Sequence, residues 1–169
     1  MASQFSLPYQ LPPIDLIPPQ ANGGALASIV YPSMRNALKA WIVVKLNQGN
    51  AATVTLTPVQ ATSSAGAGSK AIGNSGLVSQ PGAQIWLNDA TATSDAFVAQ
   101  ANALNFTTDA NVAAKEIIFE IVPEDFLDIP NGFNHIGITI GASNAANIVT
   151  ATLHIYGSYE GATPPTSYV

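Results

Sequence analysis

The stretch that decides the fold is residues 38–46, which read LKAWIVVKL. Apolar side chains recur at every second position, and both lysines fall in the alternate set. Such alternation is the period of a β-strand, because successive side chains of a strand point to opposite faces. The stretch therefore predicts a strand with one face in a core. The inward set is Ala40, Ile42, Val44 and Leu46, and the outward set is Lys39, Trp41, Val43 and Lys45.

A second β run follows directly. Residues 47–50 (NQGN) have the composition of a turn, and residues 52–61 (ATVTLTPVQA) again alternate. Two β runs joined through a short turn that contains glycine predict a hairpin. Farther along, residues 62–80 are rich in Ser, Gly and Ala, which is typical of a long surface loop.

The rest of the chain continues the β pattern, and in residues 115–122 (KEIIFEIV) the alternation predicts a strand with Ile117, Phe119 and Ile121 facing inward. No helical pattern exceeds about two turns, and residues 123–127 (PEDFL) predict a single helical turn with proline at its first position. Eight strands at regular spacing predict an all-β fold, an eight-stranded, jelly-roll-like β-sandwich. The eight predicted strands are residues 25–31, 38–46, 52–61, 84–88, 104–108, 115–122, 135–140 and 148–156.

The N-terminal segment has a different character. Five prolines within residues 4–22 predict an extended polyproline-II conformation, with a reach of roughly 50–60 Å. Its large apolar side chains require a surface, which is either the chain's own domain or a neighbouring subunit. We expect an extended proline-rich arm over residues 1–24, a β-sandwich domain over 25–160 and a loose tail over 161–169. The predicted partner-binding residues of the arm are Phe5, Leu7, Tyr9, Leu11, Pro12, Pro13, Ile14, Leu16 and Ile17.

Composition excludes several classes of protein. Hydrophobic residues make up 47% of the chain, which is enough for a core, and charged residues only 9%. The net charge is −5 and the five basic residues are scattered, so we expect no direct binding of nucleic acid. The absence of cysteine excludes disulfides and thiolate metal sites. Without a signal-peptide pattern or an apolar run of about 18 residues, we expect a protein made in the cytoplasm that does not enter the membrane.

No persuasive active site emerges. His135 and His154 lie in predicted strands, opposite the aliphatic side chains, and are expected to be exposed or at an interface. Residues 66–70 (GAGSK) superficially resemble a phosphate-binding loop, but a serine interrupts the required Gly-Lys pair and no helix follows. The acidic residues near position 125 fit the start of a helix better than a calcium loop. We expect no enzymatic activity, no cofactor, no metal and no small-molecule substrate.

A long part of the chain resembles a family of tailed-bacteriophage virion proteins that associate with the capsid as decoration or cement proteins. The resemblance runs over residues 37–70 (ALKAWIVVKLNQGNAATVTLTPVQATSSAGAGSK), then through 71–72, 84–87, 107–109 and 115–121. It ends with 131–133 (NGF) and 141–148 (GASNAANI), and so covers most of residues 37–156. The N-terminal arm is outside it.

The resemblance implies a jelly-roll-like subunit on the surface of a virion capsid, assembled in the host cytoplasm. Its implied partners are the major capsid protein and copies of itself, as a homotrimer that bridges neighbouring capsid subunits. Two alternatives stay open: a head-fibre base or tail component, and a carbohydrate-binding β-sandwich. Trp41 and Trp86 are candidate interface residues if the chain is a capsid-associated protein. They are candidate sugar-stacking residues if the chain is a carbohydrate-binding β-sandwich.

Overall fold

The computed structural model describes residues 11–73 and 82–157, and this part of the chain is all-β apart from two short helical turns. Its strands form two antiparallel sheets. The helical turns are α2 (Pro123–Phe126) and the 3₁₀ turn η1 (Ile129–Asn131). The strands are β1 (Ile14–Ala21), β2 (Leu26–Ala27), β3 (Ala37–Gln48), β4 (Thr55–Ala61), β5 (Lys70–Ala71), β6 (Ala83–Asn88), β7 (Val98–Ala103), β8 (Phe106–Thr107), β9 (Ala114–Ile121), β10 (His135–Ile140) and β11 (Asn147–Gly157).

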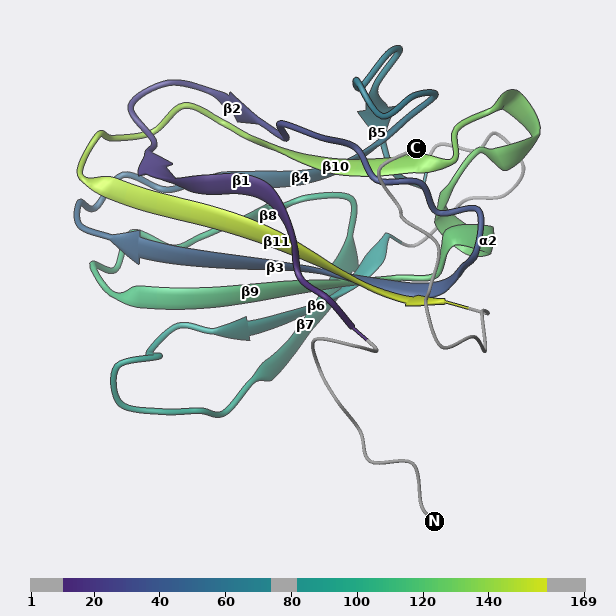
Figure 1. Ribbon diagram of the computed structural model, residues 1–169. Coiled ribbons are helices and arrows are strands. Elements are labelled where there is room, and N and C mark those ends of the chain that lie inside the picture. The colour runs from purple at the N-terminus through teal and green to yellow at the C-terminus, as the bar shows by residue number, and fades with distance from the viewer. Residues whose placement is uncertain (1–10, 74–81, 158–169) are drawn as a thin grey trace.

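The two sheets are built from strands far apart in the sequence. One has six strands in the order β1-β11-β3-β9-β6-β7; the other has the order β2-β10-β4-β5, with β8 also paired to β4. In Figure 1 the strands β10 and β4 lie above, and β3, β9, β6 and β7 fan out below them. One apolar core draws on both sheets, as in a β-sandwich.

The alternation of the sequence is confirmed in the two central strands of the larger sheet. In β3 the predicted inward set, Ala40, Ile42, Val44 and Leu46, is buried. In β9 the side chains of Ile117, Phe119 and Ile121 are fully buried, whereas the residues between them are partly exposed. The period-two pattern therefore identified the core face of both strands.

From Ile14 onward the N-terminal segment is not a free arm: of the two surfaces left open by the sequence, it packs on the chain's own domain. Residues Ile14–Ala21 form β1, which pairs with β11 as a strand of the chain's own domain. Ile14, Leu16 and Ile17 belong to the core instead of being free to bind a partner. The prolines Pro18 and Pro19 are tolerated because β1 is an edge strand and its register shifts between Ile17 and Gln20. The domain therefore begins before residue 25.

The predicted hairpin is wrong. β3 pairs with β11 and β9, whereas β4 pairs with β10, β5 and β8, so the turn after β3 carries the chain from one sheet to the other. The buried amide of Asn147 fixes this crossing: Oδ1 accepts from the backbone N–H of Asn50 at 2.9 Å, and Nδ2 donates to the carbonyl of Ala52 at 3.0 Å. Among the described residues there are eleven strands, three of them with only two residues.

Part of the outward side of the smaller sheet, around Gly137, is covered by its own chain. The ring of Tyr31 lies so close to Gly137 that a Cβ there would be 2.5 Å from the ring, and Gly66, with φ of 79°, makes an equally close approach. The Tyr31 N–H donates to the carbonyl of Ser64 at 2.9 Å, which ties residues 62–69 over this sheet. Desolvation raises the pKa of the Tyr31 hydroxyl, although a hydrogen bond with Ser69 opposes the rise.

Candidate functional site

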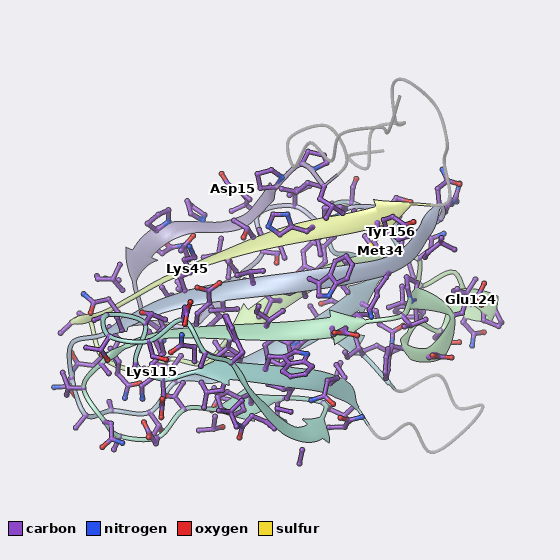
Figure 2. The ribbon with its side chains drawn as sticks, turned by 90° about the horizontal axis from the view of Figure 1, so that it is seen from below. Asp15, Met34, Lys45, Lys115, Glu124 and Tyr156 are labelled. Atoms are coloured by element: carbon purple, nitrogen blue, oxygen red, sulfur yellow. The ribbon has the colours of Figure 1, made fainter. Side chains whose placement is uncertain are left out.

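The outward side of the six-stranded sheet gathers the aromatic residues that the sequence singled out. Val43 of β3 lies opposite Ile118 of β9, which lies opposite Trp86 of β6. One step along, Trp41 of β3 lies opposite Glu120 of β9. All five side chains are partly exposed. We call this surface the aromatic face; Figure 2 looks onto its sheet, with Lys45 toward one end and Tyr156 toward the other.

The two tryptophans are close enough to act on one partner. They lie on strands separated only by β9, and their positions are offset by two residues along the sheet. With strands about 4.8 Å apart and a rise of about 3.3 Å per residue, their Cα atoms are on the order of 12 Å apart. A single docking segment or subunit therefore reaches both.

Glu120 links the tryptophans through charge and hydrogen bonds. Its Oε2 accepts from Trp86 Nε1 at 3.3 Å, and its Oε1 forms an ion pair with Lys39. The Lys39 ammonium also lies 5.5 Å from the centre of the Trp41 ring, within range of a cation–π contact. Partial burial raises the pKa of Glu120, but hydrogen bonds and charge from Lys39, with further bonds from Trp86 and Trp41, outweigh it and lower the pKa overall. Glu120 is therefore a carboxylate at neutral pH.

The remaining charges of the central strands are balanced. Lys45 of β3 lies directly opposite Glu116 of β9, as Lys39 is paired with Glu120. Opposite charges in cross-strand positions attract each other, so the face carries little net charge at its centre. At the end of the sheet where Lys45 and Glu116 pair, an open hollow of about 490 Å³ is lined by these two residues and by Thr150, among others. A surface with compensated charge is cheaper to remove from water than one with isolated charges.

The N-terminal segment reaches the border of this face. His154 lies opposite Trp41 and its Nδ1 is 3.1 Å from the carbonyl oxygen of Leu11. Leu11 is half-buried, whereas Pro12 and Pro13 are exposed. Of the predicted arm residues, Phe5, Leu7 and Tyr9 lie outside the described residues. The described chain thus begins one strand away from Trp41.

Both histidines were expected to be exposed or at an interface, and the structure agrees for His154 but not for His135. His154 is partly exposed on the outward side, as expected. His135 is buried, with 7% of its surface exposed, at the start of β10. The expectation failed because the first half of β10 is covered on both sides, by the core and by the segment that bridges Ser33 to His135 and places Tyr31 against Gly137.

The structure brings together residues that sequence reasoning did not combine. Trp41 and Trp86 were selected singly, and both lie on the aromatic face. Lys39, Glu120 and His154 were not assigned to a site, although Lys39 already stood in the outward set of its strand. The pairing of β3 with β9, and of β9 with β6, is a long-range property that no local pattern encodes.

The fold and this surface define an all-β, β-sandwich-like protein with an aromatic face on its larger sheet. No protein-family model, curated protein or solved structure matches the chain. In the described residues, no helix has the length and apolarity needed to cross a membrane.

Proposed function

We propose that this chain is a non-enzymatic virion structural protein that binds a capsid lattice and stabilises it by bridging neighbouring subunits. The aromatic face is the surface that would pack against the major capsid protein. The resemblance over residues 37–156 supports this class of protein, and the low charge of 9% fits a molecule with much of its surface in contact with others.

The strand pairing supports a jelly-roll architecture within this proposal. If β6, β7 and β8 are set aside, the first of the eight remaining strands pairs with the last (β1 with β11) and the second with the seventh (β2 with β10). The third pairs with the sixth (β3 with β9) and the fourth with the fifth (β4 with β5). This nested pairing is that of a long antiparallel hairpin rolled into two sheets.

The single observation that carries the proposal is the gathering of large apolar side chains on one outward surface. Trp41, Val43, Ile118 and Trp86 lie together on the larger sheet and remain partly exposed, whereas the partly exposed residues of β4 and β10 on the smaller sheet are the threonines Thr55, Thr57 and Thr139. Tryptophan is enriched at the centres of protein interfaces, because a large ring excludes water over a wide area. Apolar area removed from water stabilises a contact by about 25 cal/mol per Å².

A lattice amplifies such contacts. Each copy that bridges two subunits gains a second contact at a high effective concentration, so moderate single contacts give firm attachment. The homotrimer implied by the resemblance would present three aromatic faces, one from each copy. Leu11 meets the border of the face at His154, and we propose that the segment before Leu11 adds apolar contacts from Phe5, Leu7 and Tyr9.

The experiment is binding of the purified chain to shells assembled from the major capsid protein of the same genome. We expect saturable co-sedimentation, and a loss of about tenfold or more in affinity for Trp86→Ala, since a central interface tryptophan contributes on the order of 2 kcal/mol. The control is Phe133→Ala, which changes a partly exposed aromatic residue near η1, away from the aromatic face. Equal binding by both variants would show that the face does not dock.

Carbohydrate binding is the second candidate, because two tryptophans on one open sheet face resemble a sugar-stacking platform. Lys39 over the Trp41 ring and the bond from Trp86 to Glu120 count against it, since both rings already have polar partners. A glycan array discriminates: specific hits that Trp86→Ala abolishes would favour this reading. Imaging on the particle separates a capsid position from a head-fibre or tail position.

A further inference from the structure

The edges of the two sheets are protected to different degrees. A sheet edge presents unpaired backbone N–H and C=O groups, and proteins usually block it with charge, proline or a very short strand. β1, at one edge of the six-stranded sheet, carries Asp15, Pro18 and Pro19. In the other sheet β2, β5 and β8 have only two residues each. These edges are poor templates for another strand.

β7 lacks these three protections, although its register with β6 shifts between Gln100 and Ala103. It has six residues, VAQANA, with no charge and no proline, and among the described residues it pairs only with β6. Ala99, Ala101 and Asn102 are exposed. In Figure 1 the strand forms the lower border of the sheet. Its small side chains leave room for a neighbouring backbone to approach at the ordinary spacing of about 4.8 Å.

Both ends of β7 carry exposed apolar side chains. Phe97 precedes the strand with 37% of its surface exposed, Leu104 follows it with 37%, and Val98 is 62% exposed. When two copies of such a strand pair antiparallel, the Phe97 end of one copy meets the Leu104 end of the other. The same contact that satisfies the edge therefore covers the apolar residues at both of its ends.

We propose that β7 is a self-association edge, at which a second copy of this chain adds its own β7 antiparallel and joins the two sheets into one. The partner is a second copy because the edge is self-complementary. A two-fold axis brings the same residue of both copies together, so a charged residue near the axis would repel its own copy. Residues 97–104 carry no charge. This contact is two-fold and is independent of docking through the aromatic face.

Sedimentation velocity of the full-length chain over a wide concentration range tests the proposal. We expect a reversible association that doubles the mass of the free species, whether that species is a monomer or the homotrimer implied by the resemblance. Ala101→Lys should weaken this association about tenfold or more, because two ammonium groups meet near the two-fold axis. The matched control is Ala21→Lys, an exposed alanine in the edge strand β1 of the same sheet, which should leave the association unchanged.

A charge-swap arm separates a lost contact from a lost fold. Self-association of Ala101→Lys alone and of Ala101→Glu alone should each be weakened. When the two variants are mixed they should associate with each other, and amide exchange in β7 should become slower than in either variant alone. A wild-type species whose mass does not double with concentration, an association that Ala101→Lys leaves intact, or mixed variants that fail to associate would each overturn the proposal.

Discussion

At the scale of single residues, the least expected feature is a buried lysine. The Lys115 side chain is 1% exposed at the start of β9 and forms an ion pair with Asp109, whose side chain is 49% exposed. Gln48 holds the same loop by donating to the Asp109 carbonyl at 2.8 Å. An ammonium group removed from water is costly without a counter-charge, so Asp109 is required for this end of the sandwich to close.

This pair makes stability depend on pH. The hydrogen bond from Lys115 lowers the pKa of Asp109, against a smaller opposing effect of burial. A carboxyl whose folded pKa is lowered contributes stability that is fully present above its ordinary value of about 4, and that is lost as the pH falls through the lowered pKa. The pair therefore stabilises the fold at neutral pH and ceases to do so in acid.

We expect Asp109→Asn to lower the free energy of unfolding at neutral pH by on the order of 2 kcal/mol, and to weaken its acid dependence. Urea unfolding at several pH values measures both. Adding Lys115→Met to Asp109→Asn should restore much of the loss, because no buried charge remains. Asp95→Asn, in the loop between β6 and β7, is the control; a loss equal to that of Asp109→Asn would contradict this role for the pair.

At the scale of elements, β1 divides the N-terminal region into two parts. From Ile14 onward the chain belongs to the domain, with Leu16 and Ile17 fully buried. Residues 1–10 lie before the strand and before the His154 contact of Leu11. Of these two parts, only residues 1–10 can therefore be removed without deleting described core residues.

We expect deletion of residues 1–10 to leave the thermal midpoint of the domain nearly unchanged, and deletion of residues 1–22 to unfold it or lower the midpoint sharply. The longer deletion removes three buried aliphatic side chains, each contributing about 1.5–3 kcal/mol. Circular dichroism during heating distinguishes the two. As a finer probe, Leu16→Ala should cost about 2–5 kcal/mol, whereas Pro13→Ala, at an exposed site, should cost little. Equal thermal midpoints for the two deletions would contradict the assignment of β1 to the folded domain.

Sequence reasoning succeeded where the signal was local. The alternation in residues 38–46 and 115–121 predicted β3, β9 and their core faces, and the proline-led turn at 123–127 predicted α2. It failed for β1, because Pro18 and Pro19 argue against a strand unless the strand is known to be an edge. It failed for the hairpin because a short turn is compatible with crossing between sheets, and the Asn147 contacts that fix the crossing span 95 or more residues.

The site was predicted in part for the same reason. Trp41 and Trp86 were recognisable as large aromatic residues in strands, but their common face depends on β9 lying between β3 and β6. The network around Glu120 joins residues from three strands. No single stretch of the sequence carries that arrangement.

At the scale of the whole molecule, three surfaces have different characters. The outward side of the smaller sheet is partly covered by Tyr31 and residues 62–69, the aromatic face is partly exposed and balanced in charge, and the β7 edge is open and uncharged. The proposals give the latter two surfaces separate roles: the face for the capsid lattice and the edge for a second copy. A subunit with two independent contacts of this kind is suited to linking neighbours across a shell.

The most direct measurement is a cryo-electron microscopy reconstruction of virions encoded by the same genome, at a resolution that places individual strands. We expect the domain on the outside of the capsid, with the sheet that contains Trp41 and Trp86 turned toward the major capsid protein. A particle that lacks the chain, or one in which this sheet faces solvent while another surface makes the contacts, would contradict the proposal.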